Sequence, residues 1–339
     1  MKRSFGILPD GKEAYLYMIT GGGLTAEISD YGATLWSLQV PDKNGDVADV
    51  VLGFQDVNGY RTSTTYFGAT VGRNANRIGG AQFVLNGKTY QLPANDNGRN
   101  NLHSAPDSYA FRLWKVVAHK QNSITFGLHS PDGDQGFPGN ADIEVTYRLE
   151  EGGVLKIVYD AECDQDTVFN LTNHTYFNLA GHDHPEKAMA QTLQMNATFF
   201  TVADAESIPT GENRSVEGTP MDFRTAKPIG RDLGVEYEPL KLQGGYDHNF
   251  EAKGDVIATL CDPESGRTMD VQTDLPGVQF YSGNFLVGEI GKEGVSYCYR
   301  GGIALETQYY PDSVNHPEWP QPFTKAGQTY HTETRYIFR

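Results

Sequence analysis

The sequence predicts an all-β protein, built as a large antiparallel β-sandwich. Its 339 residues include 38 Gly, 17 Pro, 17 Phe and 19 Tyr, and signals for turns recur about every ten residues. Aromatic residues favour strands, whereas glycine and proline mark the turns between them. No apolar segment of about a dozen residues repeats with the 3.6-residue period of an amphipathic helix. Many short strands are therefore expected, with few helices.

Two hairpins carry the clearest local signals for strands. Asn86-Gly87 separates two short runs within residues 81–92, and this dipeptide favours the tight turn of a two-residue hairpin. Residues 141–159 predict a longer hairpin, because apolar and polar side chains alternate along its first strand. Further strands are predicted at residues 25–40, 49–54, 113–119, 123–130, 192–204, 255–262, 268–274, 278–285 and 303–310.

So many strands are expected to divide into two packed sheets, because a single open sheet of this size would leave long exposed edges. No linker rich in proline, serine or charge, and no internal repeat, divides the chain. We therefore predict a single domain over residues 1–339. Residues 204–238 form the longest stretch without strand signals, and a loop of that length in a compact domain is often functional.

The composition restricts the possible partners. The formal net charge is −16 at pH 7, which argues against nucleic acids, anionic membranes and highly phosphorylated substrates, because repulsion lowers the local concentration of anions. A neutral ligand is permitted. No segment approaches the roughly 20 apolar residues of a membrane span, and no signal peptide is indicated. Cys163, Cys261 and Cys298 predict neither a disulfide framework nor a zinc site. We expect a cytoplasmic protein without membrane contact.

One histidine, His174, lies in a run that is typical of a strand, residues 170–181. Alternation along such a strand places Thr172, His174 and Tyr176 on one face. Three polar side chains in a row suit the wall of a polar cleft better than a core. The alternative is a hydrogen-bonded histidine with a purely structural role.

Three other residues are candidates for acid or base chemistry. Glu306 lies among apolar residues in a predicted strand, where an unpaired carboxylate is costly; the alternative is a carboxylate that faces solvent at a strand edge. Asp247 follows Gly245 and Tyr246, so it could also be a turn residue. His103 follows an Asn-rich stretch and could be an ordinary loop histidine.

Cofactor and metal motifs are absent from the sequence. The segment that contains Arg73 and Arg77 lacks the glycine spacing of a phosphate-binding loop. His182, His184 and His316 are too few and too scattered for a metal ligand set. We therefore predict no cofactor and no metal.

Seven stretches follow one another along the chain: FGATVGRNANRIGGAQFVLNGKTYQL, NNLHSAP, LTNHTYFNLAG, SIPTGENRSVEGTPMDFR, GGYDHNF, TDLPGVQFYSGNF and GIALETQYYPDSVNHPEWP. In this order and spacing they resemble the aldose 1-epimerase (galactose mutarotase) family nearly from end to end. The resemblance implies a large β-sandwich with the sugar in an open cleft. It also implies that the protein interconverts the α and β anomers of free hexoses such as galactose and glucose.

The resemblance further implies roles for individual residues. Glu306 is implied as the general base and His174 as the general acid. The other implied residues contact the sugar: His103 near the ring oxygen, Arg77 and Asp247 at hydroxyl groups, and Asn76 and Gln279 as lesser members of the binding set.

One loop departs from the family pattern. Family members usually continue the NxLH motif with two glycines and then a Gly-Phe-Asp segment, whereas this chain has Ser104-Ala105-Pro106 and continues through Ala110. We expect a different backbone path beside His103, because glycine takes positive φ easily and alanine or proline does not. The preferred aldose therefore stays open.

The implied reaction needs only proton transfers. A base removes the proton of the C1 hydroxyl, an acid protonates the ring oxygen, C1 rotates, and the ring closes again. Burial is expected to raise the pKa of Glu306, which makes it a stronger base. Nearby carboxylates are expected to hold His174 in its cationic form, ready to donate.

Three other functions stay possible on the sequence alone. A glycoside hydrolase would need two carboxyl groups about 5–5.5 Å or 6.5–9.5 Å apart and would leave His174 and His103 idle. A silent sugar-binding module would not need a matched acid and base. An epimerase that acts on sugar phosphates is disfavoured by the acidic composition. Whether the protein is a monomer or a homodimer is also open.

Overall fold

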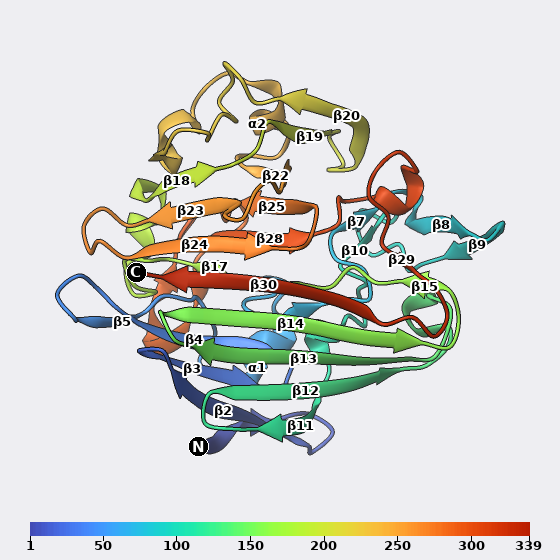
Figure 1. Ribbon diagram of the computed structural model, residues 1–339, viewed down its shortest axis with the longest axis horizontal. Helices are drawn as coiled ribbons and strands as arrows, with labels where there is room; N and C mark the ends of the chain where they lie inside the picture. Colours follow the sequence, from blue (N-terminus) through green and yellow to red (C-terminus); the bar gives the residue numbers. More distant parts are fainter.

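The computed structural model describes residues 1–339 and consists mainly of antiparallel strands in three principal sheets (Figure 1). The largest sheet has nine strands, which follow one another in Figure 1 from β11 at the bottom to β18 near the top. In order these are β11 (Lys115–His119), β12 (Ser123–Ser130), β13 (Ala141–Glu150), β14 (Val154–Cys163), β30 (Tyr330–Phe338), β24 (Thr268–Thr273), β23 (Ala258–Cys261), β18 (Thr192–Met195) and β21 (Lys227–Pro228).

The other two principal sheets have six and five strands. The six-stranded sheet runs in the order β17 (Tyr176–Phe177), β28 (Ile303–Gln308), β25 (Gly277–Tyr281), β22 (Asp247–Glu251), β19 (Phe199–Ala203) and β20 (Pro209–Ser215). The five-stranded sheet is a meander of β1 (Lys2–Ile7), β2 (Glu13–Gly21), β3 (Leu24–Ser29), β4 (Thr34–Pro41) and β5 (Val47–Asp49).

Five two-stranded pairs and a few short helices complete the fold. The pairs are β6 (Thr70–Val71) with β16 (Thr172–Asn173), β7 (Arg77–Ile78) with β10 (Asn101–Leu102), β8 (Gln82–Leu85) with β9 (Lys88–Gln91), β15 (Thr167–Val168) with β29 (Phe323–Thr324), and β26 (Glu289–Ile290) with β27 (Ser296–Tyr297). The helices are α1 (Val57–Thr62), α2 (Glu238–Leu242) and the 3₁₀ turns η1 (Gly79–Ala81), η2 (Tyr109–Phe111), η3 (Asp134–Gly136), η4 (Pro185–Ala190), η5 (Ile229–Asp232), η6 (Lys292–Gly294) and η7 (Ser313–Asn315).

None of these helices has the length and apolar character that crossing a membrane would require.

The sheets share one apolar core. Alternate residues of β13 and β14 are buried, and 53 buried residues from all three principal sheets form a single cluster. The nine-stranded and six-stranded sheets also meet through polar contacts: Tyr336 donates to the Leu305 carbonyl at 3.3 Å, and the Thr307 and Thr334 hydroxyls lie 2.6 Å apart. Burial of alternating apolar side chains between packed sheets is what stabilises a β-sandwich.

The predicted fold class is confirmed, and both predicted hairpins are present. The predicted strand at residues 25–40 is instead two strands, β3 and β4, joined by a turn, and residues 49–54 are mostly irregular. We did not predict β1, β2 or β30. The buried face of β30 alternates regularly and consists of Tyr330, Thr332, Thr334, Tyr336 and Phe338. Residues 204–238 contain β20, a mostly exposed, polar strand without an apolar face.

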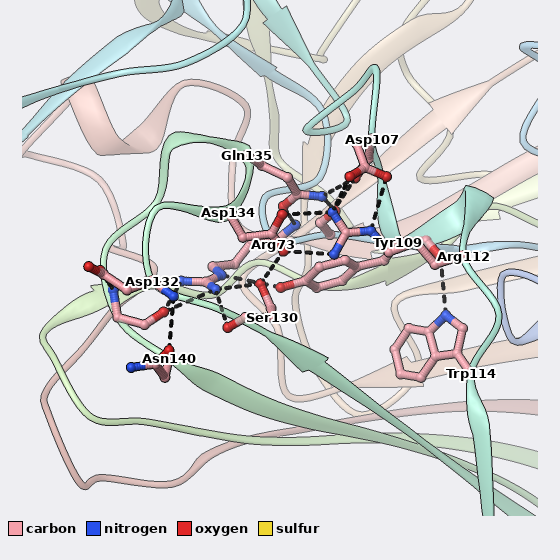
Figure 2. A network of polar contacts seen from close by, with 12 residues as sticks. Arg73, Asp107, Tyr109, Arg112, Trp114, Ser130, Asp132, Asp134, Gln135 and Asn140 are labelled. Atoms are coloured by element: carbon pink, nitrogen blue, oxygen red, sulfur yellow. Dashed lines mark hydrogen bonds and ion pairs between the residues drawn. The ribbon is translucent and has the colours of Figure 1, made fainter.

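A fully buried arginine, Arg73, fastens the segment that leads to Asn76 and Arg77 (Figure 2). No carboxylate lies within ion-pair distance of Arg73. Its guanidinium instead donates to the hydroxyls of Ser130 (2.5 Å), Thr167 (3.1 Å) and Tyr109 (3.2 Å) and to the carbonyls of Ser130 (3.3 Å), Pro138 (2.8 Å) and Gly139 (3.3 Å). Ser130 extends this network, because its hydroxyl donates a hydrogen bond to Asp134 at 2.5 Å.

Gln135 ties the atypical loop after His103 to the same network (Figure 2). Its amide nitrogen donates to the carbonyls of Gly72 (3.1 Å) and Asp107 (2.8 Å), and its amide oxygen accepts from the Arg73 backbone N–H at 3.0 Å. Arg112 pairs with both Asp107 and Asp134. The loop and the Arg73 segment therefore form one hydrogen-bonded unit.

The loop after His103 contains one non-glycine residue with a positive φ, Ser104. Ser104 has a φ of +54°, the region that favours glycine. Its hydroxyl donates to the Asn74 carbonyl at 3.0 Å and accepts from the Asn74 N–H at 2.9 Å. These two hydrogen bonds of a buried side chain help offset the strain of a left-handed serine.

We predict that Arg73→Met lowers the free energy of unfolding by about 3–5 kcal/mol, because several buried carbonyls and hydroxyls lose their donor. Urea denaturation followed by tryptophan fluorescence measures the change. Arg335→Met, at a half-exposed surface position, is the control and should cost less than about 1 kcal/mol. Equal effects of the two substitutions would contradict a stabilising role for the buried network.

Candidate active site

A pocket of about 410 Å³ lies beside one face of the six-stranded sheet and collects six of the seven predicted site residues. Those that line it are Asn76, Arg77, His103, His174, Asp247 and Glu306. Gln279 lies just behind this lining, where its amide nitrogen donates to the Asp247 carboxyl at 2.7 Å. The structure thus brings all seven predicted residues to one place, although they come from segments far apart in the sequence.

The register of the sheet aligns three of these residues. Gln279 on β25 lies directly opposite Glu306 on β28, and Asp247 on β22 lies opposite Tyr281 on β25. Directly paired residues project to the same face of a sheet, as do residues two apart on one strand. Asp247, Gln279, Tyr281 and Glu306 therefore all point toward the pocket.

His174 lies between two strands rather than within one, so the prediction of a continuous strand over residues 170–181 was wrong. The run pairs with β6 through Thr172 and Asn173 and then changes partner, pairing with β28 through Tyr176. His174 stands at this change. Its backbone is nevertheless fixed, because its N–H donates to the Ala69 carbonyl and its carbonyl accepts from the Gly68 N–H, each at 2.9 Å.

The imidazole of His174 faces the carboxyl of Glu306. Tyr176 pairs with Ala304, so the same antiparallel register, carried two residues further, sets His174 opposite Glu306. The distance from His174 Nε2 to Glu306 Oε2 is 3.5 Å, and the two side chains are 7% and 3% exposed. A carboxyl and an imidazole are therefore buried side by side at the inner end of the pocket.

His103 is held by the Asn76 turn. The backbone N–H of Asn76 donates to His103 Nδ1 at 3.1 Å, and the His103 N–H donates to the Asn76 carbonyl at 3.0 Å. Because Nδ1 accepts a hydrogen bond, a neutral His103 ring carries its proton on Nε2 and presents a donor. The His103 and His174 ring centroids are 5.3 Å apart.

Arg77 presents its cation to the pocket from the same turn. Its Nε donates to the Asp96 carboxylate at 2.9 Å, and both side chains are about 15% exposed. Asn76 has a φ of +60°, which asparagine tolerates better than most residues, and its side-chain oxygen accepts from the Arg77 N–H at 2.8 Å. The turn therefore orients Arg77 while Asp96 balances its charge.

Burial controls the protonation of the acidic groups in the site. It raises the pKa of Glu306 well above the ordinary value, and the neighbouring Asp247 raises it further. Burial also raises the pKa of Asp247. Both shifts follow from the cost of an anion in a medium that solvates it poorly. The raised pKa of Glu306 agrees with the prediction from the sequence.

The prediction that carboxylates hold His174 cationic was wrong. Burial lowers the pKa of His174 to about 4 and lowers the pKa of His103 well below its ordinary value, an effect to which His174 and Arg77 add. Although 3.5 Å suits an ion pair, desolvation favours the neutral form of each partner. Burial therefore shifts Glu306 toward its protonated form and His174 toward its neutral form.

The same side chains form the one group in the protein with metal-ligand character. His103, His174 and Glu306 each offer one ligand atom, and these atoms lie within 4.8 Å of one another. Two imidazoles and a carboxylate are a ligand set that zinc uses in proteins. A metal ion bound to these side chains would occupy the lone pairs that the implied acid–base reaction uses.

Several pocket residues were not predicted from the sequence. They are the polar segment 62–65, Tyr66, Tyr176, Tyr281, Phe285, Leu286 and Glu289. Tyr281 could have been found from alternation, because it lies two residues after Gln279 on the same strand. Tyr176 was placed beside His174 on the predicted face but was given no role. No pattern in the sequence marks Tyr66 or Phe285.

A rigid sheet wall that carries a buried carboxyl beside an imidazole, with further side chains able to bind hydroxyl groups, suits an acid–base isomerase of small polar molecules. Comparison with known proteins defines the class further. The family model described as Aldose 1-epimerase matches residues 15–337. The chain belongs to the aldose 1-epimerase family.

Individual relatives cover almost the whole chain. An aldose 1-epimerase of Haemophilus influenzae is 40% identical, and a galactose mutarotase of Bos taurus is 41% identical, each over 98% of this chain and 97% of the relative. Among solved structures, an aldose epimerase homologue from C. elegans has a TM-score of 0.89 at 32% identity, covering 96% of this chain and 99% of that chain. The predicted family and the predicted enzyme class, an isomerase, are confirmed.

We predict that both site histidines stay neutral from pH 8 down to about pH 5, because burial lowers the pKa of each. The pH dependence of the imidazole Cε1–H resonances in NMR spectra measures this, with His103→Ala and His174→Ala used for assignment. In urea-unfolded protein both resonances should titrate near pH 6.5. Titration of either histidine near pH 6.5 in the folded protein would contradict the desolvated site.

Proposed function

We propose that this protein interconverts the α and β anomers of free hexoses such as galactose and glucose, with Glu306 as general base and His174 as general acid. The observation that carries the proposal is the buried contact of 3.5 Å between His174 Nε2 and Glu306 Oε2 inside the pocket. Proton transfer by positioned side chains requires both groups within hydrogen-bond reach of the reacting atoms. The galactose mutarotase name of a relative 41% identical to this chain supports galactose as a substrate.

One proton on the Glu306–His174 pair is sufficient for the reaction. It moves from Glu306 to His174, which leaves a carboxylate that is a strong base because it is poorly solvated. The carboxylate takes the proton of the C1 hydroxyl while the imidazolium donates a proton to the ring oxygen. The bond between C1 and the ring oxygen breaks, and the C1–O bond becomes a carbonyl.

Ring closure reverses these transfers. Rotation about the C1–C2 bond presents the other face of the aldehyde to the C5 hydroxyl. His174 takes back the hydroxyl proton as the ring closes, and Glu306 returns a proton to the C1 oxygen. The site ends with the same proton count, so no external acid or base is consumed. His103 is placed to donate a hydrogen bond through Nε2, with Arg77 and Asp247 binding hydroxyl groups.

The charges in the pocket favour a free sugar over a sugar phosphate. Apart from the two histidines, Arg77 is the only basic residue that lines the pocket, and it is already paired with Asp96. Asp247, Glu289 and Glu306 line the same pocket. A phosphate dianion would therefore meet carboxyl groups without a free cation to bind it. The comparisons support neither a glycoside hydrolase nor a silent sugar-binding module.

A cytoplasmic location, with a small sugar as the only partner, is part of the proposal. The free cysteines Cys163, Cys261 and Cys298 agree with a reducing compartment. Whether the protein acts as a monomer or a homodimer is best determined by light scattering.

We predict that Glu306→Gln lowers kcat by about 10²–10⁴-fold, because glutamine cannot take the C1 hydroxyl proton. Polarimetry on freshly dissolved α-galactose measures the rate, and calorimetry should show sugar binding that is weakened much less. Glu251→Gln, on strand β22 but outside the pocket, is the matched control and should retain normal activity. Near-normal mutarotation by Glu306→Gln would refute the assigned base.

A comparison of galactose with galactose 6-phosphate tests the substrate class. We predict that kcat/KM is about 10- to 100-fold lower for the phosphate, since Arg77 is already paired with Asp96 and the protein as a whole carries a net charge of −16. The difference should shrink as the salt concentration rises, because ions screen the repulsion. Equal kcat/KM values at low salt would show that the reasoning from pocket charge is wrong.

A further inference from the structure

Tyr66 contacts both histidines of the site, although nothing in the proposed reaction gives it a role. Its ring centroid lies 4.8 Å from that of His103 and 5.8 Å from that of His174, with interplanar angles of 54° and 31°. Tyr66 is half-buried and lines the pocket. Its hydroxyl makes no hydrogen bond within the protein, so the contacts that it makes with the site are those of its ring.

The backbone at Tyr66 is strained. Its φ is +56°, in the left-handed region that a bulky residue rarely adopts. Such strain persists where the surroundings impose it, often at functional sites. A glycine at this position would avoid the strain. The contacts of the tyrosine side chain must therefore offset it.

The strained backbone also joins Tyr66 to His174. The Tyr66 carbonyl accepts from the Ala69 N–H at 3.0 Å, which closes a turn over residues 66–69. The last residues of this turn, Gly68 and Ala69, make the two backbone hydrogen bonds that hold His174. The same short turn therefore sets the position of the tyrosine ring and of the imidazole that it touches.

Phe111 also packs against the Tyr66 ring. The Tyr66 and Phe111 centroids are 5.2 Å apart at 40°. Phe111 closes η2, directly after the loop at Ser104–Ala110 that departs from the family pattern. This loop is fastened by Gln135 and Arg112 to the Arg73 network, so Phe111 rests on a fixed base. A continuous aromatic contact runs from Phe111 through Tyr66 to both imidazoles.

We propose that Tyr66 is a positioning residue whose ring, braced by Phe111, covers the two imidazoles, excludes water from them and fixes His174 relative to Glu306. This inference rests on the proposed function, because its value lies in keeping the acid and the base in register for one sugar. The ring acts through His174 and His103 and takes no proton itself, as the pKa of Tyr66 is raised by burial to about 12.

The electrostatic consequence follows from what faces the imidazoles. The titratable groups around them are Glu306, Asp247 and Arg77, together with the phenols of Tyr66, Tyr176 and Tyr281. Burial is the main cause of the lowered pKa of both histidines. The Tyr66 ring, which is itself half-exposed, is one of the groups that bury them. Its removal lets water reach His174, which favours the imidazolium form.

Three substitutions test the role of the ring. Tyr66→Ala removes it, Tyr66→Gly removes it and also relieves the backbone strain, and Tyr66→Phe keeps it without the hydroxyl. For Tyr66→Ala and Tyr66→Gly we expect kcat for galactose to fall by about 10- to 100-fold, as for a misplaced catalytic group, with KM changed much less. Tyr66→Phe should restore kcat to within about twofold. Phe111→Ala should show a smaller loss of the same kind.

The pKa of His174 is a second measurement. It would not change if Tyr66 only stabilised the fold. In Tyr66→Ala and Tyr66→Gly its pKa, followed by NMR, should rise from about 4 toward the ordinary value near 6.5, and Tyr66→Phe should leave it low. The acid limb of the kcat/KM profile should shift in the same direction. Tyr66→Gly guards against a folding defect, because glycine accepts the backbone conformation without strain.

Two results would overturn the inference. Unchanged kcat and unchanged His174 titration in Tyr66→Ala and Tyr66→Gly would show that the ring positions nothing. A loss of kcat in Tyr66→Phe as large as in Tyr66→Ala would show that the hydroxyl acts instead of the ring. Failure of the proposed function is a separate outcome: the unsubstituted protein would not speed mutarotation, whereas the His174 titration would still report on the ring.

Discussion

The site depends on one constraint, the exclusion of water from a carboxyl and an imidazole that are 3.5 Å apart. In water these two groups would ionise separately. Burial raises the pKa of Glu306 and lowers the pKa of His174, which favours the neutral form of each. The pair can then supply a base and an acid in the same step from a neutral resting state. The remaining features of the fold keep these groups dry and in register.

Both the sheets and the irregular segments hold the two groups in place. The six-stranded sheet fixes Glu306 beside Gln279, and the switch of partner between β16 and β17 brings His174 to the opposite position. The irregular segments are fixed differently, by buried hydrogen bonds. Arg73 and Gln135 fasten the segments that carry Asn76, Arg77 and the loop after His103. Loops that hold binding groups thus gain the rigidity of a scaffold.

Prediction from the sequence was most accurate where the pattern of residues follows directly from packing. Alternation in β13 and β14 and the Asn86-Gly87 turn predicted strands correctly, and the ordered motifs led to the family. It failed where tertiary contacts override local signals. The predicted strand through His174 breaks because its pairing partner changes there, from β6 to β28. The charge state of His174 depends on burial that no spacing reveals. The roles of the seven site residues stay predictions, although the structure brings those residues together.

The reacting groups differ in charge from the protein as a whole. The protein carries a formal net charge of −16, yet burial favours the neutral forms of Glu306 and His174, and Arg77 is paired with Asp96. A hexose is itself uncharged, so neither its capture nor its release moves a net charge into or out of the protein. Dissolved ions therefore have little long-range attraction to weaken. Turnover of an uncharged sugar is therefore expected to vary little with ionic strength.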